Sequence, residues 1–239
     1  MSAQTEPKAA ARAPLSRKRV LRAAIALADD GGIDSLTMRR LAEKLGAEAM
    51  SLYYHVANKE AVLDGVVEVI LDEIDEAVST VDGPPADVDW KNAMRTRILT
   101  AREVLLRHPW APAVIESRTT VSPAAMRYFD GLLGLFRQGG FSYDLAHHAL
   151  HALGSRALGF TQELFEPDEP DPGEEDATGM LEEMADEFPH LVGMVAEVSH
   201  NDPDSTLGWC DDQFEFEFAL DLILDGLERL KQTESHPKP

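Results

Sequence analysis

Residues 37–56 constrain the fold of this chain more than any other segment, because they hold two short helical patterns separated by a tight turn. Thr37 is a typical N-cap residue, and Gly46 ends the first pattern. The apolar positions of the two patterns are Leu41, Ala42, Leu45, Leu52 and Val56. Two short helices joined at a glycine turn are typical of a helix-turn-helix, in which the second helix enters the major groove of DNA.

Helical patterns also flank this segment. An earlier one begins after Ser16, also an N-cap candidate, and stops at two aspartates and two glycines, residues 29–32. A long one begins after Asn58, a third N-cap candidate, and ends before the pair Pro84-Pro85. We therefore predict a disordered basic arm over 1–15, a helix-turn-helix domain over 16–62 with a linking helix over 58–80, and a second domain over 85–239.

The charges are distributed very unevenly along the chain. The whole chain carries a net charge of −21, which by itself argues against a nucleic-acid partner. Residues 1–60, however, hold ten Lys and Arg against seven Asp and Glu, whereas the remaining 179 residues hold twelve against thirty-six. A basic head on an acidic body is the asymmetry expected when one end meets phosphates, although a basic N-terminus is also compatible with a simple solvated arm.

Residues 36–66 resemble the DNA-binding domain of the tetracycline-repressor (TetR) family. The resemblance rests on spaced identities, namely Ala42, Gly46, Leu52, Tyr53, His55, Asn58, Lys59 and Leu63. Residues 138–163 and 216–230 are similar to the last two helices of the tetracycline-repressor type of sensor domain. This resemblance implies an all-α fold: a three-helix helix-turn-helix DNA-binding domain followed by a helical-bundle domain for dimerisation and ligand binding.

The resemblance also implies which residues contact double-stranded operator DNA. Arg39 matches a position that reaches a base edge, where guanine is its natural partner. Ala49 and Met50 depart from the polar residues usual at the start of the recognition helix, so they are limited to apolar contacts such as thymine methyls. Either tyrosine could instead brace the helix packing. The complete predicted set is Thr37, Arg39, Ala49, Met50, Ser51, Tyr53, Tyr54, His55 and Lys59.

The acidic body contains six further helical patterns. They lie near 89–107, 110–117, 122–139, 142–166, 178–200 and 211–232. The last begins with strand-like alternation over 214–218, but its long uninterrupted continuation favours a helix. In the TetR family the equivalents of 142–166 and 211–232 form a four-helix bundle across a two-fold axis, so we expect a homodimer.

The family resemblance further implies an unknown small-molecule effector. Candidate pocket residues are apolar or aromatic, with Glu163 added because it matches a family position near the effector: Trp90, Met94, Ile98, Trp110, Phe129, Leu133, Phe160 and Glu163. The region 116–120 lacks the histidine that helps tetracycline repressors hold a drug-bound magnesium, which argues against that effector. The acidic segment 166–190 is interpreted as a solvated loop leading into a helix, with a lid for a cationic effector as the alternative.

No metal or cofactor is expected. His147 and His151 have an i, i+4 spacing that suits zinc, but no nearby Cys or second His pair completes a tetrahedral site. The chain also lacks the nucleophile and phosphate-binding motifs of the common enzyme classes. We therefore predict a DNA-binding transcriptional regulator rather than an enzyme, and from the resemblance we expect a homodimeric repressor that a small-molecule effector releases from its operator. The alternatives are a transcriptional activator of the same fold and an acidic protein–protein adaptor.

The cellular location is predicted from the lack of a disulfide, of a signal peptide and of a transmembrane segment in the sequence. The single cysteine, Cys210, cannot form an intramolecular disulfide, and the sequence shows neither a signal peptide nor a transmembrane segment. The expected location is the cytoplasm, with no membrane partner.

Overall fold

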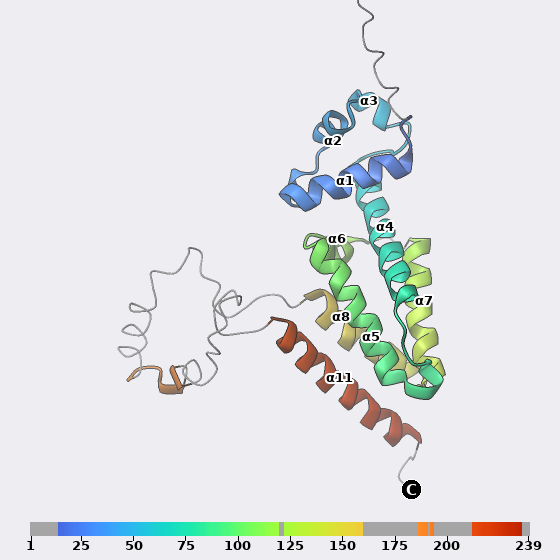
Figure 1. Ribbon diagram of the computed structural model, residues 1–239, viewed down its shortest axis with the longest axis vertical. Coiled ribbons are helices and arrows are strands. Elements are labelled where there is room, and N and C mark those ends of the chain that lie inside the picture. Colours follow the sequence, from blue (N-terminus) through green and yellow to red (C-terminus); the bar gives the residue numbers. More distant parts are fainter. Residues whose placement is uncertain (1–13, 120–121, 160–185, 191, 194–211, 236–239) are drawn as a thin grey trace, which may run out of the picture. The chain divides into compact units, whose positions relative to one another are not determined.

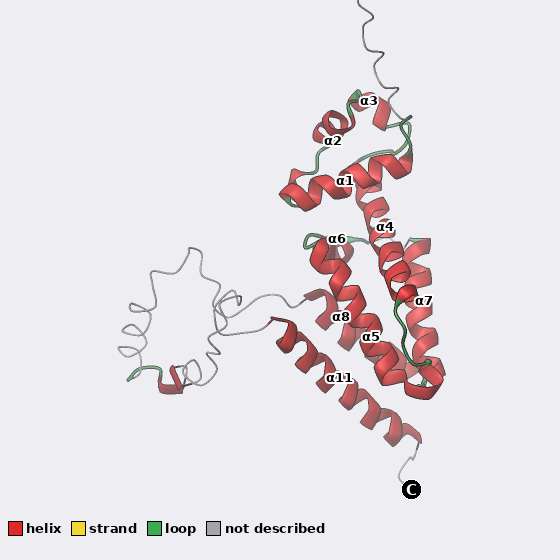
Figure 2. Cartoon of the chain, viewed as in Figure 1, coloured by secondary structure: helices red, strands yellow, loops and turns green. Residues whose placement is uncertain are grey.

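A computed structural model describes residues 14–119, 122–159, 186–190, 192–193 and 212–235. Among these residues the regular structure is helical and no strand occurs, which confirms the predicted all-α class (Figure 2). The elements are α1 (Arg17–Gly31), the 3₁₀ helix η1 (Ile33–Ser35), α2 (Met38–Leu45), α3 (Ala49–Leu52), α4 (Lys59–Thr80), α5 (Ala86–Arg107), α6 (Ala111–Ser117), α7 (Pro123–Gln138), α8 (Tyr143–Gly159) and α11 (Asp212–Ser235). None of the described helices is long and apolar enough to span a bilayer.

Some predicted segments fall outside this description. The arm over 1–15 is described only from residue 14, and the helix predicted over 142–166 is described as far as Gly159. Most of the acidic segment 166–190 and of the helix predicted near 178–200 also lies outside the described residues. The strand-like start of the last helical pattern is helical, since α11 begins at Asp212.

The described residues divide into two compact units. The first contains the described parts of Met1–Gly83 and Thr96–Leu132, and the second those of Pro84–Arg95 and Leu133–Pro239. The first unit therefore holds α1 to α4, the greater part of α5, α6 and the start of α7. Helix α4 is joined in this unit to the three helices that precede it.

Side-chain caps and one left-handed glycine set boundaries of α1 and α2. Ser16 Oγ accepts a hydrogen bond from the backbone N–H of Arg19, and Thr37 Oγ1 accepts one from that of Arg40. Gly46 ends α2 in the left-handed conformation at φ 61°, where a side chain would be strained. Both caps and the glycine turn were predicted, and all three are confirmed. The apolar faces of α1 and α2 are buried, as is Leu52 of α3, so these three helices share one small core.

Helix α4 packs against α1 (Figure 1). Asn58 caps it as predicted, with Oδ1 accepting from the backbone N–H of Ala61 at 2.8 Å. Its buried face includes Val62, Val66 and Ile70, spaced as a helix requires. Near the start of α4, Gly65 lies against Leu21 of α1, and the sequence did not indicate this contact.

In the second unit α8 packs along α11, and an aromatic cluster fills the core beside them. Trp90, Phe136 and Phe141 are buried, with the rings of Trp90 and Phe141 meeting edge to face at 4.5 Å. Ion pairs tie the start of α5 to α11, including Arg95 Nε to Asp221 Oδ1 at 2.8 Å. These contacts hold α8 and α11 as a packed pair.

Candidate nucleic-acid interface

Buried leucines and backbone hydrogen bonds fix the conformation of the α2–α3 turn. Leu41, Leu45 and Leu52 are buried and point into the small core shared with α1. Across the turn, the backbone N–H of Ala47 donates to Ala42 O at 3.0 Å, and that of Gly46 donates to Glu43 O at 3.0 Å. Because these three leucines point inward, the opposite side of the α2–α3 pair faces solvent.

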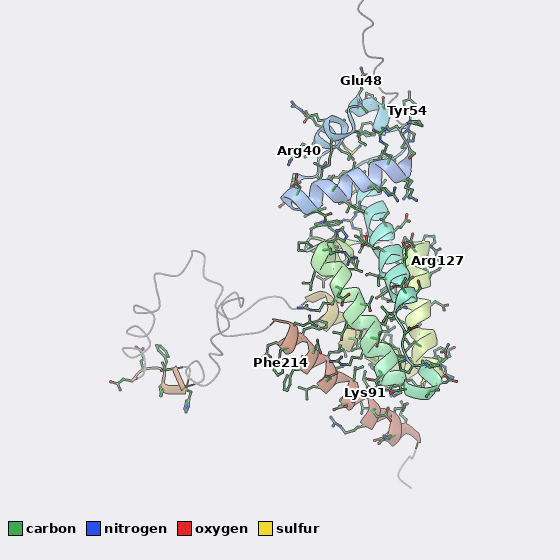
Figure 3. All side chains as sticks on the ribbon, viewed as in Figure 1. Arg40, Glu48, Tyr54, Lys91, Arg127 and Phe214 are labelled. Carbon is green, nitrogen blue, oxygen red and sulfur yellow. The ribbon has the colours of Figure 1, made fainter. Side chains whose placement is uncertain are left out.

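The recognition segment is a single helical turn, Ala49–Leu52, followed by a turn through Tyr53, Tyr54 and His55. The backbone N–H of Val56 still donates to Leu52 O at 3.0 Å, so the chain keeps a helical path beyond the end of α3. This segment presents a compact group of side chains to solvent at one end of the first unit, as the labelled Glu48 and Tyr54 show (Figure 3).

The predicted recognition residues differ in exposure. Tyr54 is 88% exposed and Met50 71%, although both are large and partly apolar. Tyr53 is 44% exposed, whereas Ser51 is half-buried. Ala49 at the start of α3 is exposed as well. An 88% exposed tyrosine does not brace the packing, so Tyr54 is available to an external partner.

At the start of α2, Arg39 lies on the surface with 88% of its side chain exposed. Its Nε donates to Oε1 of Glu43, one turn along the same helix, at 3.0 Å. An exposed i, i+4 pair of this kind contributes about 0.3–0.5 kcal/mol, so a base edge can replace Glu43 as the partner at small cost. Thr37 is exposed and caps the first turn of α2 through the backbone N–H of Arg40, at a helix N-terminus of the kind that favours a phosphate.

The second phosphate-binding candidate is the start of α4. Lys59 is its first residue and is exposed, while His55 is half-buried in the preceding turn. Helix α4 is 22 residues long, so its N-terminus carries the positive end of a full helix dipole. The first unit thus carries all nine predicted DNA contacts, on α2, α3 and the segment leading into α4.

Two basic residues near this surface were not singled out from the sequence. Arg40 donates from Nη1 to Ser35 O at 3.2 Å, and Lys44 donates from Nζ to Ala26 O at 3.3 Å. Both are exposed and follow Arg39 along α2 (Figure 3). The basic composition of residues 1–60 was the available signal, but composition does not show on which side of a helix a charge lies.

The predicted effector residues are distributed over both units. Met94 and Trp90 are buried in the second unit, where Trp90 donates its indole N–H to Glu228. In the first unit Ile98 is buried and Phe129 is 46% exposed, while the buried Trp110 donates its indole N–H to Asp29 Oδ1 at 2.7 Å. The other members are Leu133, half-buried in α7, and Phe160 and Glu163, which lie outside the described residues.

The histidines of α8 lie on its exposed side. The rings of His147 and His151 are 4.7 Å apart and meet edge to face. In the part of the chain that the structure describes, no group of three or more His, Cys, Asp or Glu side chains is arranged to hold a metal ion.

Comparison with known proteins gives two family matches. Residues 20–66 match the family described as bacterial regulatory proteins, tetR family, and residues 83–230 match that described as tetracyclin repressor-like, C-terminal domain. The chain is 32% identical over 221 residues to the tetracycline repressor protein class C of Escherichia coli, which covers 92% of this chain and 93% of that protein.

Solved structures give the same result. A TetR family transcriptional regulator from Streptomyces coelicolor A3(2) superposes with a TM-score of 0.68 at 30% identity, over 90% of this chain and 100% of the other. The ActR protein of Streptomyces coelicolor in complex with actinorhodin superposes with a TM-score of 0.67 at 25% identity, over 92% and 99%.

Proposed function

The chain belongs to the TetR family of bacterial regulatory proteins, and on that premise we propose that it is a homodimeric repressor that reads operator DNA with one helix-turn-helix per protomer. It is a DNA-binding transcriptional regulator released by a small-molecule effector. The observation that carries the proposal is the exposed group around α2 and α3, where Arg39, Met50 and Tyr54 face solvent on a rigid turn.

Base readout is assigned to residues that differ in chemistry. Arg39 offers a planar fork of donors that suits guanine O6 and N7. Ala49 and Met50 have no donor or acceptor for a base edge and contact thymine methyls instead. Ser51 and the hydroxyl groups of Tyr53 and Tyr54 supply the remaining hydrogen bonds. We therefore propose that the operator half-site combines a guanine opposite Arg39 with thymines opposite the start of α3.

Phosphate contacts fix the protein on the duplex without reading its sequence. We assign them to Thr37 with the amides of α2, to His55, and to Lys59 at the start of α4. In each protomer, we expect these phosphate contacts to lie on both sides of the bases that α3 reads.

The homodimer is proposed to form through α8 and α11. Along α11, Phe214, Phe218 and Leu222 follow one another at four-residue spacing and are 62%, 54% and 56% exposed. An exposed apolar stripe of this kind marks an interaction surface, and the two-fold pairing of TetR proteins supplies its occupant, a second copy of the chain. Dimerisation also gives the protein two half-sites, about one helical turn apart, which a single helix-turn-helix lacks.

The effector site is proposed to lie in the domain over 83–230, because that domain matches the tetracyclin repressor-like family and because ActR binds actinorhodin. An effector releases the operator only by binding one state of the dimer more tightly than the other. The candidate pocket residues named above remain predictions. A protein that works on operator DNA acts in the cytoplasm, and this is the location we propose.

Fluorescence anisotropy with the DNA upstream of the chain's own gene tests the proposal. We expect saturable binding whose affinity falls steeply with salt, because counterions are released from the phosphates. The double variant Arg39→Ala, Lys59→Ala should abolish the specific component. Binding without salt dependence, or binding that this variant leaves unchanged, would contradict the DNA-binding assignment, and an acidic adaptor would show no binding at all. A reporter gene behind the same DNA distinguishes a repressor from an activator.

A further inference from the structure

A polar cluster ties the end of α1 to the turn between α5 and α6. Asp29 Oδ1 lies 2.7 Å from Nδ1 of His108 and also accepts the indole N–H of Trp110 at 2.7 Å. His108 and Trp110 are 8% and 6% exposed, so two buried ring nitrogens converge on a single carboxylate oxygen. We refer to Asp29, His108 and Trp110 as the Asp29 anchor. All three belong to the first unit.

The cluster extends to α4. His108 Nε2 lies 3.5 Å from Glu73 Oε2, and Arg107 Nη2 pairs with Glu73 Oε1 at 2.6 Å. The turn that carries His108 is closed by its own backbone bonds, from His108 N to Leu105 O and from Ala111 N to His108 O. The partners of Asp29 are therefore held firmly by α4 and α5.

The position of Asp29 conflicts with local helix preferences. It lies in the last turn of α1, where the helix dipole disfavours a carboxylate, and that turn holds Asp30 as well but no basic residue. A residue that opposes the local preference and is satisfied only by distant partners points to a role outside its own helix.

Helix α1 has a second attachment near its other end. Gly65 of α4 touches Leu21, and Arg17 Nη2 pairs with Glu68 Oε2 at 2.9 Å. Leu21 and Asp29 are eight residues apart, about 12 Å along a helix. If the Asp29 anchor were lost, α1 could pivot about the contact at Gly65. Because α2 packs on α1 and α3 packs on α2, any such pivot would move the recognition segment.

We propose that Asp29 is a positioning residue that sets the tilt of the helix-turn-helix, and thereby the operator half-site spacing that the dimer accepts. This inference rests on the proposed operator-binding function. In that role Asp29 touches no DNA. It determines how sharply the protein distinguishes between spacings, because a rigid pair of recognition segments fits one spacing and a loosely attached pair fits several.

The test uses the full-length protein and an operator selected from a random DNA library by the wild type. Affinities are measured on this operator and on versions with one base pair inserted or removed between the half-sites, which shifts one half-site by about 3.4 Å and rotates it. The variants are Asp29→Ala and Trp110→Phe; the second keeps an aromatic side chain, although a smaller one, and removes the indole N–H. The control is Asp30→Ala, which removes the same charge one residue along without touching the Asp29 anchor.

We expect the loss of affinity caused by the altered spacing to be about threefold smaller in both variants than in the wild type, the lower end of what one hydrogen bond contributes. The control should behave as the wild type. A purely structural role would lower the folded fraction and weaken binding to all probes equally, so the ratio between probes separates positioning from stability. Unchanged ratios in Asp29→Ala and Trp110→Phe would overturn the inference, whereas failure of the wild type to select any operator would overturn the proposed function instead.

Discussion

Gly65 of α4 lies directly against Leu21 of α1, so closely that a β-carbon at Gly65 would stand 2.6 Å from Leu21 Cδ2. Leu21 is buried in the core of the three-helix cluster and cannot move aside without disturbing it. Because Gly65 has no side chain, α4 can approach α1 closely. Through this contact the cluster of α1, α2 and α3 is packed on α4.

Gly65→Ala should therefore destabilise the protein by about 1–3 kcal/mol, the usual cost of overpacking a core. The measurement is the urea midpoint of unfolding of the full chain. Gly131→Ala is the matched control, because Gly131 is exposed in α7 and nothing lies within 4 Å of the added carbon. That control should be stabilised by roughly 0.5–1 kcal/mol, since alanine is the better helix former. Equal effects at the two sites would show that the Leu21 contact is not tight.

Arg39→Ala should weaken operator binding by about 1–3 kcal/mol and relax the preference for one base of each half-site. Anisotropy titrations against operators substituted at single positions measure both effects. Glu43→Gln is the informative control, since it removes the carboxylate that pairs with Arg39 in the free protein. This control should bind the operator at least as tightly as the wild type. An unchanged base preference in Arg39→Ala would assign Arg39 to the phosphates instead.

Lys59→Ala should weaken binding to all sequences alike, because a phosphate contact carries no base information. In a plot of log affinity against log salt, the slope should become shallower by about one unit per lost contact, hence about two for the dimer. Lys91→Ala serves as control, as Lys91 pairs with Asp225 in the second unit. A slope that does not change in Lys59→Ala would remove Lys59 from the interface.

Phe218→Glu should weaken the dimer, since it places a charge in the apolar stripe of α11. We expect the dissociation constant from sedimentation equilibrium to rise by at least about tenfold, typical of an interface core residue. Leu106→Glu is the control, because Leu106 is 56% exposed on α5, close to the 54% of Phe218, and lies outside the stripe. Equal dimerisation of Phe218→Glu and the control would place the interface elsewhere.

Stability should fall in acid through Glu228. Burial raises the pKa of this carboxyl, but hydrogen bonds from Lys231, Trp90 and Gln232 outweigh it, so the pKa lies below its ordinary value of 4.5. A carboxyl with a depressed pKa contributes stability that is present above pH 4.5 and is lost as the pH falls through its folded-state pKa. Glu228→Gln keeps an acceptor for Trp90 and should show a smaller loss of stability between pH 7 and pH 3 than the wild type. An identical pH profile would contradict this assignment.

The sequence determined the local features of this protein. Ser16, Thr37 and Asn58 were predicted as caps and act as caps, because an N-cap depends only on a side chain and the amides two or three residues ahead. The turn at Gly46 was also predicted from the sequence, and Gly46 is left-handed. The solvent-exposed side of α2 and α3 was predicted too, since once the apolar positions of these helices are assigned to the core, the other side of each helix faces solvent.

Tertiary structure alone decided which distant residues meet. No residue close to Gly65 in the sequence indicates that Leu21 occupies the space of the missing side chain. The sequence predicted no partner for the indole N–H of Trp110, which the structure directs to Asp29, 81 residues earlier. Helical periodicity reports that a side chain is buried but not against what, because it describes one helix at a time. Local rules thus determined the helices and the exposed side of α2 and α3, while packing between helices decided how that side is held.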